Sequence, residues 1–255
     1  IWGSAWVGLN NFYEFFSDGE FLRALRNTVI FSLGKLALQF PTAIILALAL
    51  NELRHARIKK LYQTVFTFPH FISWVVMAGI LKNMFASNGV INQLLTVWGM
   101  ESVSPLLSLT GFRPFIWFSN IWKEAGWDTI IYMATLAGID PGLYEAAEID
   151  GANRWRKIWH ITLPGIRSTI LIMLILEIGR IMTTGASFDQ VFNLYSSPVY
   201  EVADTIDTYI YRTSFGGTKN FGYTTAVGLS KSIIGVLMML GANRMVTACG
   251  EDGLF

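Results

Sequence analysis

Residues 140–164 read D-P-G-L-Y-E-A-A-E-I-D-G-A-N-R-W-R-K-I-W-H-I-T-L-P, a polar stretch between two long apolar segments. Asp140 can cap the free N–H groups of a first helical turn, and Pro141 suits the first helical position. Gly151 is a suitable end for this helix. A second, short amphipathic stretch follows, and its two faces are formed by Trp155, Ile158 and Trp159 and by Arg154, Arg156 and Lys157. These residues alone indicate a solvated helix–turn–helix lying on a membrane surface.

The composition places the whole chain in a bilayer. Of its 255 residues, 53% are hydrophobic, 14% aromatic and only 15% charged, which is too apolar for an ordinary soluble domain. The formal net charge of +1 gives no basic surface for nucleic acid. The single cysteine excludes an internal disulfide and a metal cage built from cysteines.

The apolar runs predict an all-α, polytopic membrane protein. A span needs about 20 mostly apolar residues, and such runs in lipid form helices because the backbone finds no other hydrogen-bond partners there. Five spans are expected, at residues 27–50, 64–86, 112–138, 165–187 and 223–243. We expect one transmembrane domain over residues 1–255, with outer loops at 1–25, 87–111 and 188–222, and a cytoplasmic loop at 139–164. Residues 1–25 form an interfacial segment in this scheme, and 201–212 form a short helix in the last outer loop.

Basic residues predict the orientation in the membrane. Cytoplasmic segments carry an excess of Lys and Arg, and these residues gather after the first span, in the 139–164 loop and at the start of the tail: Arg54, Arg57, Lys59, Lys60, Arg154, Arg156, Lys157 and Arg244. The loop at 139–164 and the C-terminus are therefore expected in the cytoplasm, with residue 1 outside.

The 139–164 loop resembles the cytoplasmic signature loop of permease subunits in binding-protein-dependent ABC importers. The shared spacing is E-A-A, three residues, G, nine residues, I-x-L-P, and it is carried by Glu145, Ala146, Ala147, Gly151, Ile161, Leu163 and Pro164. Asp150 and Ala152 complete the D-G-A form of the carbohydrate branch. W-V-G-L-N-N-F at 6–12, V-A-D-T-I-D-T-Y-I-Y-R at 202–212 and G-E-D-G-L-F at 250–255 are similar to its polysaccharide and oligosaccharide permeases.

The resemblance implies the type I importer permease fold and a set of partners. Family members carry a further span upstream, so an N-terminal helix is expected to be missing from this sequence, although a five-span core is the alternative. The chain is expected in the bacterial cytoplasmic (inner) membrane, beside a second and different permease subunit. Two ATPase subunits would bind ATP and magnesium, and this chain would hold no cofactor. The helix at Glu145–Gly151 would dock in an ATPase cleft, and an external binding protein would deliver the saccharide. Loop 188–222 is a candidate surface for that protein, or simply a solvated loop.

Ionisable and aromatic residues inside the spans suggest a substrate pathway. Buried charges are costly in lipid and often face a wet cavity, and aromatic rings stack on sugars. The candidate residues are Lys35, Trp117, Asn120, Glu124, Trp127, Asp128, Glu177, Arg180 and Lys231. The alternative is that they hold helices together, Glu177 and Arg180 as an intrahelical pair. Because Lys35, Arg180 and Lys231 outnumber the two glutamates, the set suits an acidic saccharide such as alginate.

The sequence carries no sign of catalysis. It has no G-x-x-x-x-G-K-[ST] loop, its histidines are scattered, and no G-x-S-x-G elbow is present. No catalytic, cofactor-binding or metal-binding residues are therefore expected, and the chain is interpreted as a transport subunit and not an enzyme. The competing hypothesis is an ion-coupled secondary transporter, in which Glu124, Asp128 and Glu177 bind the ion.

Overall fold

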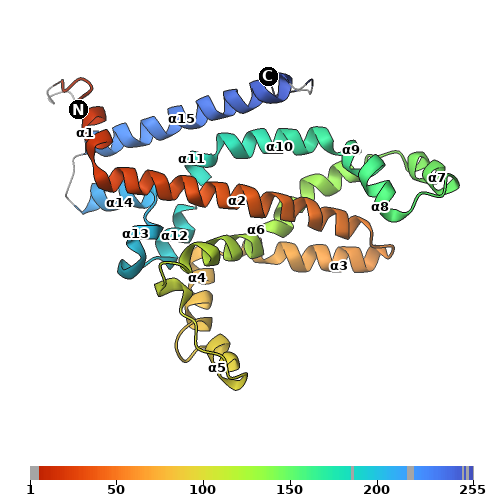
Figure 1. Cartoon of the computed structure of the whole chain (residues 1–255), viewed down its shortest axis with the longest axis horizontal. Helices are drawn as coiled ribbons and strands as arrows, with labels where there is room; N and C mark the ends of the chain where they lie inside the picture. The colour runs from red at the N-terminus through yellow and green to blue at the C-terminus, as the bar shows by residue number, and fades with distance from the viewer. Residues whose placement is uncertain (1–5, 185–186, 217–220, 249, 251–252, 255) are drawn as a thin grey trace. The chain divides into compact units, whose positions relative to one another are not determined.

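The computed structural model describes residues 6–184, 187–216, 221–248, 250 and 253–254. Every regular element in these ranges is a helix (Figure 1). Small parts of the expected outer segment, fourth span, last outer loop and C-terminal motif lie outside the described residues: 1–5, 185–186, 217–220, 251–252 and 255. The chain divides into two compact units, which are described one at a time.

Unit 1 comprises Ile1–Lys35, Ser73–Trp117 and Arg180–Leu237. It contains the first parts of three long helices, α2 (Gly19–Asn51), α6 (Phe112–Leu136) and α15 (Phe221–Ala248). Its shorter elements are α1 (Asn10–Ser17), α4 (Trp74–Met84), α5 (Val90–Val97), η2 (Pro105–Leu107), α11 (Ile181–Thr184), α12 (Phe188–Leu194), η4 (Ser197–Val199), α13 (Tyr200–Ala203) and α14 (Ile206–Phe215). The Trp117 ring of α6 packs directly on the α2 backbone here, because a Cβ at Gly34 would lie 2.1 Å from that ring.

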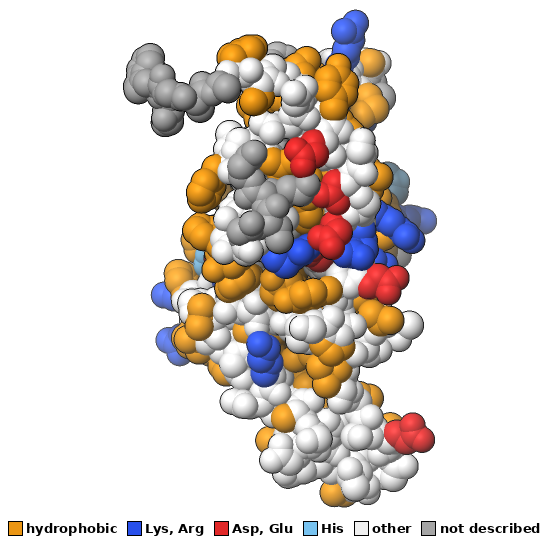
Figure 2. Space-filling view, turned by 90° about the vertical axis from the view of Figure 1, so that its left-hand side faces the viewer, with side chains coloured by type: hydrophobic (Ala, Val, Ile, Leu, Met, Phe, Trp, Pro, Cys, Tyr) orange, Lys and Arg blue, Asp and Glu red, His pale blue; other side chains and the backbone are white. Residues whose placement is uncertain are grey.

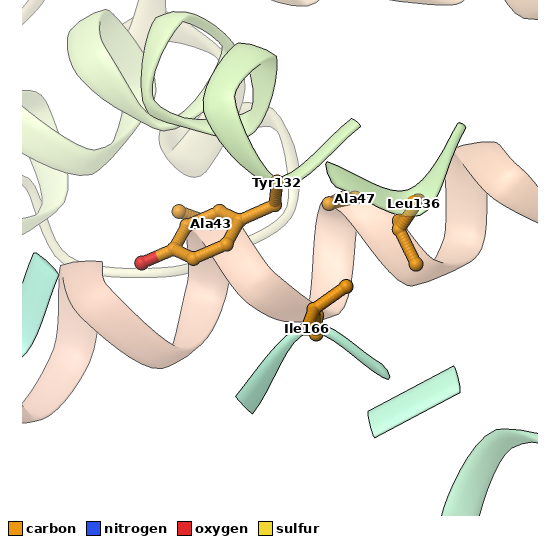
Figure 3. Packing of buried hydrophobic residues seen from close by; sticks show 5 residues of the cluster. All are labelled: Ala43, Ala47, Tyr132, Leu136 and Ile166. Atoms are coloured by element: carbon orange, nitrogen blue, oxygen red, sulfur yellow. The ribbon is translucent and has the colours of Figure 1, made fainter. Parts of the chain in front are cut away.

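Unit 2 comprises Leu36–Ile72, Phe118–Gly179 and Met238–Phe255. Besides the second parts of α2, α6 and α15, it contains α3 (Ala56–Thr67), η1 (Phe68–Phe71), α7 (Pro141–Ile149), α8 (Arg154–Lys157), the π-helical turn η3 (Ile158–Thr162), α9 (Leu163–Gly165) and α10 (Arg167–Gly179). Its buried core joins α2, α6 and the junction between α9 and α10 through Ala43, Ala47, Tyr132, Leu136 and Ile166 (Figure 3). The two small alanines of α2 leave room for the larger side chains that pack on them.

The expectation of five spans is not confirmed. Two helices, α2 and α15, are long and apolar enough to cross a membrane, or up to four if two bent pairs each form one span. One pair bends by 99° between α3–η1 and α4, and the other bends by 60° between α8–α9 and α10. The expected third span, now α6, is not among these candidates, and its 25 residues carry Arg113, Lys123, Glu124 and Asp128.

Several expected boundaries also shift. The first long helix begins at Gly19, inside the segment expected to be interfacial, because Asp18 caps it through the backbone N–H of Glu20 (2.8 Å). The fourth expected span is interrupted at Arg180, between α10 and α11. The outer loop at 87–111 contains a helix, α5, that the sequence analysis did not predict, and the helix expected at 201–212 is found as α13 and α14.

Candidate functional site

The helix expected after residue 140 is present as α7 and starts as predicted. The Asp140 carboxylate accepts a hydrogen bond from the Gly142 backbone N–H (2.9 Å), and Pro141 occupies the first turn. Proline costs nothing there, because its missing N–H would have had no partner within the helix. The start of α7 is therefore fixed by two adjacent residues.

The end of α7 is also fixed locally, by Gly151. This glycine has φ +72°, in the left-handed region that favours glycine. The Ala152 N–H donates to the Ala147 carbonyl (2.8 Å), and the Gly151 N–H donates to the Glu148 carbonyl (3.1 Å). These two bonds form a Schellman motif, which satisfies carbonyls that a helix end otherwise leaves free. A Cβ at position 151 would meet nothing within 4 Å, so the backbone conformation and not crowding is what requires glycine.

Two side-chain contacts brace α7 against the segment that follows it. The Tyr144 hydroxyl lies 3.1 Å from the hydroxyl of Thr162, which is buried at the end of η3. The Lys157 ammonium of α8 donates to Glu148 Oε1 (2.7 Å), and this hydrogen bond and charge lower the pKa of the Glu148 carboxyl. The sequence analysis assigned no contact to any of these four residues, because the E-A-A spacing points to their neighbours. Both contacts tie α7 to the segment α8–η3 that follows it.

The predicted motif residues fall on two parts of the segment α7–α9. Glu145, Ala146 and Asp150 are exposed on α7 and its end, and Ala147 and Ala152 are half-buried there. The remaining motif residues, Ile161, Leu163 and Pro164, belong to η3 and α9, where the chain bends by 60° into α10. Beside the small alanines, the Ile149 side chain is 88% exposed. The structure thus gives a capped and braced helix with an open, partly apolar face, connected through α8, η3 and α9 to the apolar helix α10.

Four of the expected pathway residues lie in unit 1: Lys35 on α2, Trp117 on α6, Arg180 between α10 and α11, and Lys231 on α15. The Trp117 indole N–H donates to the Phe31 carbonyl (3.2 Å), so this ring is held against α2. Lys231 donates to the Asp207 carboxylate of α14. Asp207 lies in the segment 188–222 that was expected to be an outer loop, and the structure makes it the counter-charge of Lys231.

The other five lie in unit 2: Asn120, Glu124, Trp127 and Asp128 on α6, and Glu177 on α10. The Gln39 side chain of α2 accepts from Asn120 and donates to Asp128. These two expected pathway residues therefore contact a neighbouring helix, as the packing alternative expects.

Glu124 belongs to a separate cluster around the break at η1. Its carboxylate lies 2.6 Å from His70 Nδ1 and 3.0 Å from the Lys123 ammonium. The His70 ring stacks on Trp127, with ring centroids 4.2 Å apart and an interplanar angle of 5°. Neither His70 nor Lys123 was predicted as a pathway residue, because His70 meets α6 only in the folded chain and Lys123 was not among the polar residues selected on the third expected span.

A polar network in unit 1 joins α2 to α14 and α15. Asp18 accepts hydrogen bonds from the Tyr209 hydroxyl (2.8 Å) and the Tyr223 hydroxyl (3.1 Å). Burial alone would raise the pKa of Asp18, but these bonds and those from the α2 backbone lower it below its usual range. Arg212 pairs with Glu20 (3.0 Å) and with the buried Asp204 (2.9 Å). Figure 2 shows a face on which acidic and basic side chains gather, bordered by hydrophobic ones.

Comparison with known proteins supports the resemblance seen in the sequence. Residues 39–247 match the family described as binding-protein-dependent transport system inner membrane component. The chain is 43% identical over 256 residues to the polygalacturonan/rhamnogalacturonan transport system permease protein YteP of Bacillus subtilis (strain 168), which covers 100% of this chain and 79% of that protein. It is 31% identical over 226 residues to the lactose transport system permease protein LacF of Rhizobium radiobacter, covering 86% of this chain and 74% of that protein.

A solved structure agrees with these relatives. A chain in the crystal structure of a bacterial alginate ABC transporter, in complex with an alginate pentasaccharide-bound periplasmic protein, has a TM-score of 0.92 and 39% sequence identity. The similarity covers 97% of this chain and 85% of that one. None of these relatives supports the ion-coupled alternative. The chain belongs to the family of inner membrane components of binding-protein-dependent transport systems, and it is a permease subunit of an importer of that class.

Proposed function

We propose that this permease subunit carries an acidic oligo- or polysaccharide into the cytoplasm and that α7 is the part through which partner ATPases drive it. The observation that carries the coupling role is the construction of α7. It is capped by Asp140, ended by Gly151, braced by Tyr144 and Glu148, and connected to α10 through α8, η3 and α9. A movement imposed on a helix that is fixed in this way is transmitted to α10, whereas a loosely held loop would deform instead.

The contact with an ATPase would use the exposed face of α7. Ala146 and Ala147 allow a close approach, Glu145 and Asp150 offer acceptors, and Ile149 adds apolar area. ATP and magnesium belong to the two partner ATPase chains in this scheme, and this chain performs no hydrolysis. A second, different permease subunit and an external binding protein complete the transporter, and the outer helices α12–α14 are the proposed surface for the binding protein.

The proposed topology keeps the five spans. The bent pairs α3–α4 and α8–α10 each count as one span, and α6 is the remaining one. Polar residues on α6 are tolerable because Asn120, Asp128 and Glu124 all have partners within unit 2. The loop with α7 and the C-terminus lie in the cytoplasm, and the helix α5 lies outside.

Two observations favour an acidic substrate. Relatives similar over nearly the whole chain are named for polygalacturonan and for the acidic polysaccharide alginate. In this chain Lys35, Lys123, Arg180 and Lys231 are cations on the membrane helices or beside them, and of these Lys123 pairs with Glu124 (3.0 Å) and Lys231 with Asp207. Arg180→Ala should reduce transport of an acidic saccharide more than transport of a neutral one. Unchanged transport of the acidic substrate by this variant would remove the basis for the charge argument.

Three substitutions at Gly151 test the coupling role. Asn and Asp both tolerate the left-handed conformation better than other non-glycine residues, and they differ by one charge. Gly151→Asp should therefore uncouple ATP hydrolysis from transport, because it places a charge at the end of the docking face, whereas Gly151→Asn should stay near wild type. Gly151→Ala should show an intermediate loss through about 1–2 kcal/mol of backbone strain.

The readout is saccharide transported per ATP hydrolysed by the intact transporter in vesicles, with binding-protein affinity as the control. Equal coupling ratios for the Asp and Asn variants and the wild type would contradict the docking role. Copurified partner chains identify the assembly in the same experiment, since an importer of this class must retain a nucleotide-binding chain.

A further inference from the structure

Unit 2 contains a cleft of about 710 Å³ between the second part of α2 and the segment α8–α9. Its walls include Ile44, Ile45, Leu48 and Ala49 of α2, with Ile158 and Leu163 on the other side. This volume lies within the range of about 300–1,000 Å³ that is usual for small-molecule sites. The walls are aliphatic, so the occupant must offer hydrocarbon along most of the cleft.

The cleft has one polar end. Ile166, just beyond α9, packs beside Ala43 and Ala47 of α2. From that contact, the α2 wall continues up the sequence to Glu52, and the opposite wall continues down the sequence to Arg154. The two charged residues that line the cleft therefore lie toward the same end. The residues that directly follow α2 include Arg54, Arg57, Lys59 and Lys60. Their charge places this end at the cytoplasmic surface in the proposed orientation.

Two tryptophans complete the wall near this end. Trp155 and Trp159 both line the cleft, and they remain 71% and 65% exposed. Tryptophan rings favour the boundary between lipid hydrocarbon and headgroups, because the ring is apolar and its N–H is polar. The cleft therefore spans the boundary at which a phospholipid headgroup meets its acyl chains.

We propose that this cleft binds one phosphatidylethanolamine molecule from the cytoplasmic leaflet. An acyl chain would lie along the aliphatic walls, the phosphate would accept from the Arg154 guanidinium, and the primary ammonium would donate to the Glu52 carboxylate. The lining supplies one cation and one anion, which matches a zwitterionic headgroup better than an anionic one. Among the residues that the structure describes, the ion pairs with Lys and Arg include neither Glu52 nor Arg154.

The lipid would touch the moving part of the transporter. Ile158 belongs to η3, the π-helical turn between α7 and α10, and such turns often occur at functional positions. A lipid packed against this turn would support the bent segment α8–α9, through which α7 acts on α10 in the proposed mechanism. The lipid site itself is independent of which saccharide is transported.

The first test compares lipid retained by the intact transporter after purification from vesicles of phosphatidylethanolamine and phosphatidylglycerol. Ala49→Trp should fill the cleft and reduce the retained phosphatidylethanolamine about tenfold, since each tenfold step corresponds to the loss of only a few buried methylene groups. Leu38→Trp is the matched control, because it adds the same ring to an exposed position of α2 outside the cleft lining. Equal retention by the two variants would overturn the proposal.

The second test uses the headgroup, with a substitution that leaves the fold undisturbed. Phosphatidylcholine has the same charges but no ammonium N–H to donate. Wild type should therefore prefer phosphatidylethanolamine over phosphatidylcholine by about tenfold, and Glu52→Gln should remove that preference. Arg154→Gln should weaken retention of both lipids. No preference in the wild type, or cross-linking of position 49 to a partner protein chain in place of lipid, would show that the cleft has another occupant.

Discussion

At residue 126 the backbones of α3 and α6 come so close that a side chain has no room. A Cβ at Gly126 would lie 2.2 Å from the carbonyl carbon and oxygen of Phe66 and 2.7 Å from the Thr67 nitrogen. The Gly126 carbonyl also accepts from the Thr67 hydroxyl (3.3 Å) and the Thr129 hydroxyl (2.6 Å). Backbone atoms cannot rotate away as a side chain can, so any larger residue must push the two helices apart.

Gly126→Ala should therefore destabilise the folded subunit by about 1–3 kcal/mol through overpacking. The measurement is the melting temperature of the purified transporter, with yield from the membrane as a second readout. Gly228→Ala is the control, because a Cβ there meets nothing within 4 Å and alanine favours the helix by about 0.5–1 kcal/mol. A melting temperature for Gly126→Ala at or above that of the control would refute the close approach.

Asp18 gives a prediction of pH dependence. Burial raises the pKa of Asp18, but hydrogen bonds from Tyr209, Tyr223 and the α2 backbone outweigh it, so the folded pKa lies below the usual value of 3.8. A depressed carboxyl pKa adds stability that is complete above the unfolded pKa and is lost as the pH falls through the folded pKa. The contribution of Asp18 should thus be full at pH 7 and should be lost as the pH falls through its lowered folded pKa.

Asp18→Asn isolates this effect, because asparagine caps a helix about as well as aspartate. The variant should melt below wild type at pH 7, and the two melting temperatures should converge as the pH falls through the folded pKa of Asp18. Differential scanning fluorimetry across that range provides the measurement. A constant difference between the two proteins at every pH would mean that the charge of Asp18 has no part in the network.

At the scale of elements, the stiffness of α7 depends on contacts outside its own sequence motif. The Tyr144 hydroxyl meets Thr162, and Thr162 also donates to the Lys157 carbonyl (3.3 Å). Removing the Tyr144 hydroxyl leaves the ring in place but frees one end of the brace. Such a hydrogen bond contributes about 0.5–1.5 kcal/mol.

Tyr144→Phe should consequently lower the number of saccharides moved per ATP by a few-fold, while the ATPase activity itself persists. Tyr13→Phe is a suitable control, since this tyrosine is 70% exposed on α1. Thr162→Val should reproduce the loss, and the double variant should be no worse than either single one if the two hydroxyls act together. Additive losses would show that the two side chains act separately.

The same elements show what the sequence could predict. The limits of α7 were predictable because Asp140, Pro141 and Gly151 act on their nearest neighbours in the chain. The pairs Tyr144–Thr162 and His70–Glu124 were not, since they form only after separate elements pack together. The bend of 99° after α3 was missed for a related reason. Hydropathy measures how apolar residues 64–86 are, and it does not register that Ser73 accepts from the Val76 N–H and starts a new helix at Trp74.

The orientation proposed for the whole molecule predicts which positions a reagent can reach from each side of the membrane. Val97 at the end of α5 is 80% exposed, and Ile149 on α7 is 88% exposed. In a variant with Cys249 replaced by serine, Val97→Cys should react with a membrane-impermeant maleimide in cells whose cell wall or outer membrane has been made permeable. Ile149→Cys should react only after the cytoplasmic membrane is also opened. Labelling in the reverse order would invert the proposed topology.

The central claim is that α7 contacts an ATPase, and site-specific photo-cross-linking from position 146 tests it most directly. A photoreactive amino acid would replace Ala146 in the intact transporter, and the same residue at position 13 on α1 would serve as the control. The account predicts an adduct between position 146 and a nucleotide-binding partner chain, with a yield that changes when ATP is added, and no such adduct from position 13. Cross-links from position 146 to lipid alone, or to no partner at all, would contradict the account.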